Sequence, residues 1–183
     1  LNSPLTIDGA ANSTVNGAIS GTATLTKNGA GTLTLTNNGN NYSGNTFLNA
    51  GTTTATVSNA LGLPSGTTSI AAGATLAFNA AGSINVPEML FASPGGVTDS
   101  IVNAAGTNTL SGSIFAANGP TSAVGIRTDA GSLTITGNAA IGGTTLRVGG
   151  VANTTINGQV GDSANSSLMP ALGNLNAYWQ LNE

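Results

Sequence analysis

Residues 21–51, GTATLTKNGAGTLTLTNNGNNYSGNTFLNAG, set the pattern that the rest of the chain repeats. Leu33 and Leu35 alternate there with threonines, a period of two that is typical of a strand with one buried and one solvated face. A second short strand is predicted at residues 45–49, and a third follows Gly51. Tyr42 is expected to lie over the edge of the Asn- and Gly-rich turn between the first two. The stretch therefore predicts short strands joined by tight turns.

The composition favours a thin core and an uncharged surface. Of the 183 residues, 39% are hydrophobic but only 4% are aromatic, so the core must be built mainly from Ala, Leu, Ile and Val. Charged residues make up 5%, against roughly 25% in an ordinary soluble domain, so Thr, Ser and Asn must make the surface wettable. The regular alternation and a formal net charge of only −3 argue against disorder, which usually goes with high net charge and no apolar pattern.

Missing residue types exclude several functions. The chain has no Cys and no His, so it has no disulfide, thiolate zinc site, cysteine nucleophile or Ser-His-Asp triad. Its basic residues, Lys27, Arg127 and Arg147, are too few to bind nucleic acid. No apolar run approaches the ~20 residues that span a bilayer. The first ten residues lack the features of a signal peptide, so we expect any targeting segment to have been removed.

No cofactor or metal site is predicted. Gly29-Ala30-Gly31 lacks the third glycine and the following helix of a dinucleotide-binding fingerprint, so it is interpreted as a turn. The calcium-binding repeat GGxGxD is also missing, since Gly95-Gly96 and Gly142-Gly143 do not continue in that way.

Internal repetition follows a break at Pro94-Gly95-Gly96. Four later segments echo earlier ones. They are TLSGSI at 109–114, echoing TVNGAI at 14–19; GSLTIT at 131–136, echoing GTLTLT at 31–36; GGTTLRVGG at 142–150, in the place of GNTFLNAG; and TINGQV at 155–160, which begins a third echo. Repeated short strands without a helical period indicate an all-β fold, a β-solenoid of short parallel strands.

The solenoid is expected to form one domain over residues 1–183, with a subdivision near residues 94–96. At roughly 20 residues per coil, the chain would make about nine coils and a rod on the order of 40 Å long. Equivalent residues of successive coils would then form ladders of Thr, Asn and small aliphatic side chains.

Residues 27–52 resemble the autotransporter-associated β-strand repeat, also called the passenger-associated transport repeat. The matching positions are Lys27, Gly29, Gly31, Thr32, Leu33, Leu35, Tyr42, Gly44, Thr46, Asn49, Ala50 and Gly51. The usual continuation is visible at residues 59–62 and 65–79, whereas the copy at 131–150 is weaker and Thr53 stands where the family prefers an apolar residue. The resemblance implies a right-handed parallel β-helix in large surface or extracellular proteins secreted by Gram-negative bacteria, and it implies no catalytic residue.

The carboxylates supply an alternative interpretation as a carbohydrate-active enzyme, since parallel β-helices host enzymes that set paired acids in a groove. The six acids are Asp8, Glu88, Asp99, Asp129, Asp162 and Glu183. The four aspartates, however, lie beside Gly, Ser, Thr or Ala, which favours turns in which Asp bonds its own backbone. Arg127 and Asp129 are two residues apart and would face the same way on a strand, which predicts a surface ion pair, with a catalytic pair as the sharper alternative.

The sequence favours a non-enzymatic structural protein of the bacterial surface or extracellular space, a passenger or adhesin segment that stacks end to end or continues in a longer repeat chain. The tail, residues 163–183, gathers Met169, Tyr178 and Trp179 and is expected to cap the stack or to dock another copy together with Leu5 and Ile7. A host or surface glycan is a candidate ligand. Ice binding by threonine ladders is a weaker alternative, because a strand poor in charge needs threonines for solubility in any case.

Overall fold

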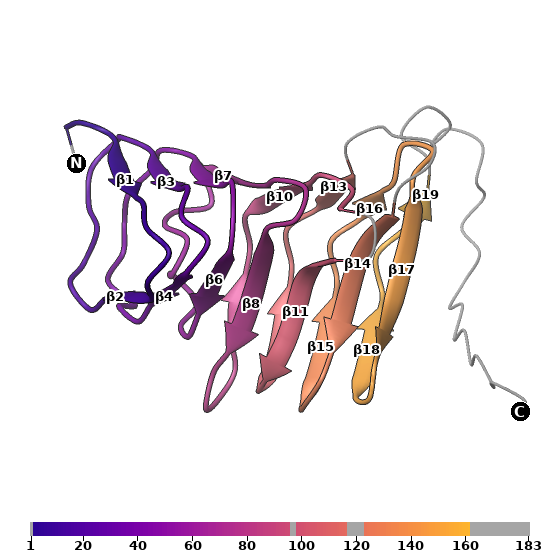
Figure 1. The fold of residues 1–183 in the computed structure, drawn as a ribbon. Helices are drawn as coiled ribbons and strands as arrows, with labels where there is room; N and C mark the ends of the chain where they lie inside the picture. The colour runs from indigo at the N-terminus through magenta and orange to yellow at the C-terminus, as the bar shows by residue number, and fades with distance from the viewer. Residues whose placement is uncertain (1, 96–97, 117–122, 162–183) are drawn as a thin grey trace, which may run out of the picture.

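The computed structural model describes residues 2–95, 98–116 and 123–161. Every regular element in these ranges is a β-strand, and every strand pairing among them is parallel. Figure 1 shows the coils stacked in chain order from the indigo N-terminal end to the yellow C-terminal end. The chain is therefore a parallel β-solenoid, which confirms the predicted fold class.

In the described residues the strands form three sheets: sheets A and B extend along the stack, whereas sheet C begins only at Asn85. Sheet A has eight strands, in the order β1 (Leu5–Ile7), β3 (Leu25–Lys27), β5 (Thr46–Leu48), β7 (Thr67–Ile70), β10 (Met89–Ala92), β13 (Ile114–Ala116), β16 (Ala139–Ala140) and β19 (Val160–Gly161). Sheet B has seven, in the order β17 (Thr145–Gly150), β14 (Ala123–Thr128), β11 (Asp99–Ala105), β8 (Thr75–Asn79), β6 (Thr52–Ala55), β4 (Thr32–Leu35) and β2 (Ser13–Val15). Sheet C has four, in the order β18 (Asn153–Ile156), β15 (Ser132–Ile135), β12 (Thr107–Leu110) and β9 (Asn85–Val86).

The coils are longer than the roughly 20 residues expected. Along sheet A, Leu5 pairs with Leu25, an offset of 20, but Leu90 pairs with Ile114 and Ile114 with Ala139, offsets of 24 and 25. Successive strands of sheet A are successive passes of the chain, so seven turns separate β1 from β19. The predicted period of roughly 20 residues per coil was therefore too short for the later coils, and the described residues make seven turns.

The core is a set of columns in which one residue from each coil stacks on the next. In sheet B, Leu33, Thr53, Leu76, Ile101 and Ile126 follow one another in register, and each is at most 1% exposed. Their neighbours along each strand face outward, as the alternation in the sequence predicts. Stacked aliphatic columns thus give a continuous core from small side chains.

Two local expectations were wrong. The segment at 14–19, expected to be a short strand like its echoes, contributes only Thr14 and Val15 to β2, because the chain then leaves sheet B and turns toward sheet A. Tyr42 does not lie over the edge of a turn: it is fully buried, and its hydroxyl lies 2.7 Å from Thr46 Oγ1. The ring fills the interior of the coil that begins with β3.

The echoes in the sequence do not all occupy equivalent places. TLSGSI at 109–114 and TINGQV at 155–160 do stack, since Thr109 pairs with Thr134 and Thr134 with Thr155 in sheet C. The segment at 14–19, in contrast, belongs to sheet B. The segment at 142–150 enters sheet B as β17, whereas the segment it was matched with supplies β5 of sheet A.

Candidate functional site: a charged groove on sheet B

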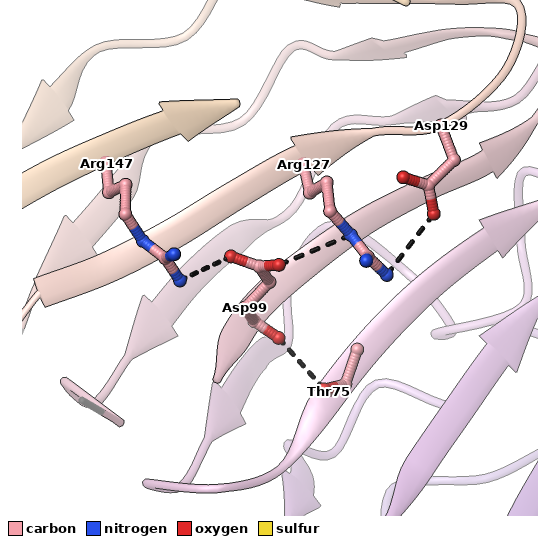
Figure 2. Close-up of polar contacts among 5 residues, drawn as sticks. All are labelled: Thr75, Asp99, Arg127, Asp129 and Arg147. Carbon is pink, nitrogen blue, oxygen red and sulfur yellow. Dashed lines mark hydrogen bonds and ion pairs between the residues drawn. The ribbon is translucent and has the colours of Figure 1, made fainter. Parts of the chain in front are cut away.

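The candidate site is a row of four charged side chains on the outer face of sheet B (Figure 2). Asp99 begins β11, Arg127 and Asp129 lie on and just after β14, and Arg147 lies on β17. Arg127 Nε lies 3.3 Å from Asp99 Oδ2, and Arg127 Nη2 lies 3.2 Å from Asp129 Oδ2. Arg147 Nη2 donates to Asp99 Oδ1 at 2.7 Å. Three consecutive strands are therefore linked by a chain of ion pairs.

Glycine makes the contact between Arg147 and Asp99, which lie two strands apart, geometrically feasible. Asp99 pairs with Gly125, and Gly125 pairs with Arg147, so Gly125 lies between the two charged residues. A Cβ on Gly125 would stand 2.4 Å from Asp99 Oδ1, closer than real Cβ atoms come, and 3.0 Å from Arg147 Nη2. Because Gly125 has no side chain, Arg147 can extend across it to Asp99.

A shallow groove of about 430 Å³ lies beside this row. Its lining comes from four adjacent strands and the loop before β11, and it consists of Thr52, Thr75, Ala77, Thr98, Asp99, Val102, Ala104, Arg127 and Asp129. The register of β11 shifts twice, between Asp99 and Ile101 against β14 and between Asn103 and Ala105 against β8. Bulges of this kind redirect side chains and often accompany functional sites. Here they place Asp99 and Ala104 on the walls of the groove.

The acidic residues considered as candidate site residues lie in different environments. Asp8 is exposed just after β1, as a turn residue would be. Asp99 is not in a turn, contrary to prediction: it lies in a strand, and its side chain is 18% exposed. The expected Arg127–Asp129 pair is present. Asp162 and Glu183 lie outside the described residues.

Glu88 is buried inside the solenoid, 3% exposed, which its sequence context does not indicate. Its Oε1 accepts a 2.6 Å hydrogen bond from Thr68 Oγ1. Burial raises the pKa of Glu88 to about 7, and the bond from Thr68 opposes that shift. Burial likewise raises the pKa of Tyr42, whose hydroxyl bonds Thr46. These four side chains form a polar interior beneath sheet A that sequence reasoning missed, because a carboxylate is normally expected at the surface.

Lys27 is also buried, 2% exposed, at the end of β3. Its Nζ donates to the carbonyl oxygens of Gly29 and, at 3.2 Å, of Ala50. Burial lowers the pKa of Lys27, whereas the charge of Asp8 raises it. The lysine that leads the repeat motif therefore serves to bind turn carbonyls of two neighbouring coils.

The expected assembly residues are only partly described. Leu5 and Ile7 lie on β1, the end strand of sheet A, and are half-buried against the core. Met169, Tyr178 and Trp179 lie outside the described residues. Over the described ranges no helix is long and apolar enough to cross a membrane, and no three acidic or other ligating side chains group there in a way that would hold a metal ion.

The groove brings two carboxylates and a guanidinium group together. The carbohydrate-active alternative requires a groove lined by at least two acids, and Asp99 and Asp129 meet that requirement. Both carboxylates, however, already contact Arg127. Hydrolysis of a glycoside needs one carboxyl group that donates a proton and a second that acts as a base or nucleophile. Two arginine-paired carboxylates supply hydrogen-bond acceptors.

Comparison with protein families matches residues 25–55 to the passenger-associated transport repeat. The match begins at the first residue of β3 and ends at the last residue of β6, so it covers one coil and the first half of the next. No curated protein and no solved structure is matched by the chain. The repeat and the β-solenoid together fit a structural domain of the autotransporter passenger type.

Proposed function

We propose that this chain, which carries a passenger-associated transport repeat at residues 25–55, is a non-enzymatic structural segment of a bacterial surface or extracellular passenger. The observation that supports this most directly is the unbroken hydrogen-bonded stack: sheet A pairs eight successive passes of the chain without a gap. In such a stack each coil is held by its neighbours on both sides, so the molecule acts as a stiff spacer.

The proposal is tested by asking whether the stack resists attack along its whole length. The full chain would be treated with proteinase K, a protease of low specificity, and the surviving fragment sized by mass spectrometry. A fragment that retains β1 to β19 is expected, because cleavage requires local opening and every interior strand has two partners. Early cleavage between coils would contradict the spacer role.

Self-association end to end is part of the proposal. The N-terminal strands β1 and β2 are outermost in their sheets, so each has a partner on only one side. Unpaired strand edges template further pairing unless something covers them. Leu5 and Ile7 at this end, together with Met169, Tyr178 and Trp179, are the proposed interface.

Sedimentation velocity over a range of concentrations would test the interface. W179A should lower the apparent mass at high concentration, while a variant of an exposed residue away from the stack ends, L63A, should not. Unchanged assembly in W179A, or equal losses in both variants, would reject this interface. Electron microscopy of the same samples would show whether assemblies are linear.

A carbohydrate-active enzyme is the second candidate, favoured by the groove that Asp99 and Asp129 line. It predicts turnover of a polysaccharide that is lost in D99N and in D129N. Reducing-end release from a panel of neutral and acidic polysaccharides would decide between the two functions. We expect no release above that of the D99N variant.

A further inference from the structure

We propose that the groove on sheet B binds a neutral saccharide, which it holds by its hydroxyl groups without cleaving it. The site would give the spacer a ligand-binding face on its side, away from both ends of the stack. It does not depend on the structural role proposed above, because a groove can bind a sugar whatever the length of the stack or its assembly.

Charge balance selects the class of ligand. Two carboxylates and two guanidinium groups lie within one row, so the formal charge of the cluster is zero. An acidic sugar would meet Asp99 and Asp129 at the wall of the groove, and a basic one would meet Arg127. A hydroxyl group can donate to a carboxylate and accept from a guanidinium at the same time. A ligand rich in uncharged hydroxyl groups can therefore bind both the carboxylates and the guanidinium groups.

The polar groups of the groove are already held in place. Asp99 is fixed on both carboxylate oxygens, by Arg147 and by Arg127, and its backbone oxygen accepts a 2.9 Å bond from Thr75 Oγ1 (Figure 2). Arg127 is in turn fixed between Asp99 and Asp129 and keeps a side-chain exposure of 46%. Each carboxylate oxygen has two lone pairs, so it can accept a further bond while its ion pair persists. A preformed site loses little entropy when a ligand binds.

The floor of the groove suits the less polar face of a sugar ring. Ala77 and Val102 are adjacent outward residues of β8 and β11, next to Arg127 in the same row, and Ala104 adds a third small apolar side chain. Thr52 and Thr75 place hydroxyl-bearing side chains along the neighbouring row. A volume of about 430 Å³ lies within the ~300–1,000 Å³ of small-molecule sites.

The chain offers a direct probe of the site, because Arg127 and Arg147 are its only arginines. A ¹⁵N-labelled sample gives two arginine Nε–H signals, and R147K would assign them. The full chain would be titrated with maltohexaose, cellohexaose, laminarihexaose and mannohexaose. Hexagalacturonate and a chitosan hexamer would serve as the acidic and basic comparators. We expect at least one neutral hexasaccharide to shift the Arg127 signal saturably, and the two charged ones to bind at least tenfold more weakly.

Variants separate the groove from the rest of the surface. D129N removes a charge at the wall, and A77L fills the floor without changing any charge; each should weaken binding by at least tenfold. D8N, at an exposed acid outside the groove, should leave binding unchanged. Each variant must retain the far-ultraviolet circular dichroism spectrum of the wild-type protein. If D129N is misfolded, A77L still tests the groove.

Three results would overturn the proposal: no shift with any neutral hexasaccharide, equal or stronger binding of a charged one, or binding that survives both D129N and A77L. None of them bears on the proteolysis result, so failure of the saccharide site and failure of the structural role can be told apart.

Discussion

Asp99 and Arg147 lie two strands apart in sheet B and 48 residues apart in the chain, yet Asp99 Oδ1 and Arg147 Nη2 meet at 2.7 Å across Gly125. The contact depends on a residue that takes no part in it. The close approach at Gly125 is therefore the first point at which the arrangement can be tested.

Gly125→Ala should lower the free energy of unfolding by up to about 1 kcal/mol, because the new methyl group displaces the ends of the Asp99 and Arg147 side chains and separates their surface ion pair. Gly149→Ala is the matched control on the next strand, where an added Cβ meets nothing within 4 Å. The control should be neutral or slightly stabilising, since it restricts the unfolded chain. Urea unfolding measures both variants, and equal effects would contradict the account.

Thr53→Val should stabilise the protein by about 1 kcal/mol. Thr53 is 1% exposed in a column between Leu33 and Leu76, and its hydroxyl has no hydrogen-bond partner in the described structure. Replacing an unsatisfied buried hydroxyl by a methyl group of the same shape removes a desolvation penalty.

Thr46→Val is the control for this substitution, because Thr46 is equally buried but bonds Tyr42. It should destabilise the protein, leaving the tyrosine hydroxyl without that partner. Thermal unfolding would show the midpoint rising in the first variant and falling in the second; a fall in both would show that the Thr53 hydroxyl is satisfied.

Stability should depend on pH through Glu88. The unfolded chain releases this proton near pH 4.5, whereas burial raises the pKa of Glu88 in the folded chain to about 7. The folded state therefore keeps a proton that the unfolded state loses. The free energy of unfolding should fall as pH rises from about 4.5 to about 7 and then level off, by roughly 3 kcal/mol at most.

Glu88→Gln tests the assignment of this dependence. Its amide oxygen can still accept the bond from Thr68, but the side chain cannot ionise. Urea titrations between pH 4 and pH 9 should give a nearly flat profile for this variant, whereas D129N should keep the wild-type slope. An unchanged slope in E88Q would assign the dependence to another group.

Gly137→Ala should destabilise the C-terminal coils by about 1–3 kcal/mol. A Cβ on Gly137 would stand 2.0 Å from the carbonyl oxygen of Gly112 in the coil before it, and Gly158 stands in the same relation to Gly137. Gly17→Ala is the control: its sequence context, TVNGAI, echoes the others, but an added Cβ there meets nothing. Similar losses in both variants would show that the sequence echo, and not the place in the stack, decides the cost.

The solenoid was predictable because its early coils repeat a clear alternation. Leu33 and Leu35 are both fully buried, as the alternation requires. The strands β11 and β14 were not predicted, because DSIVNAA and AVGIRT contain successive apolar residues and bulges that break the period of two. In β11, Ile101 and Val102 face opposite sides of the strand and are both buried, so this strand does not alternate between buried and exposed residues.

The site was predictable only in its local part. Arg127 and Asp129 are two residues apart on one strand, so their pairing follows from strand geometry alone. The pairing of Asp99 with Arg147 depends on coil length, on a bulge and on one glycine, and spacing along the chain carries none of that information. The buried Glu88 lies at a bend between β9 and β10 and bonds Thr68 of the coil before it, which likewise depends on register between coils.

Because the strands of each coil pair residue by residue with those of the next, the register between coils also limits which insertions and deletions the chain tolerates. Leu25, Thr46 and Thr68 occupy one column at offsets of 21 and 22 residues, so a deletion or duplication of one such block would bring equivalent residues back into register. A single residue inserted within a strand would instead exchange core and solvent faces along the rest of that strand. Such a molecule can grow or shrink over evolution in whole coils, while an indel of one residue is confined to its corners.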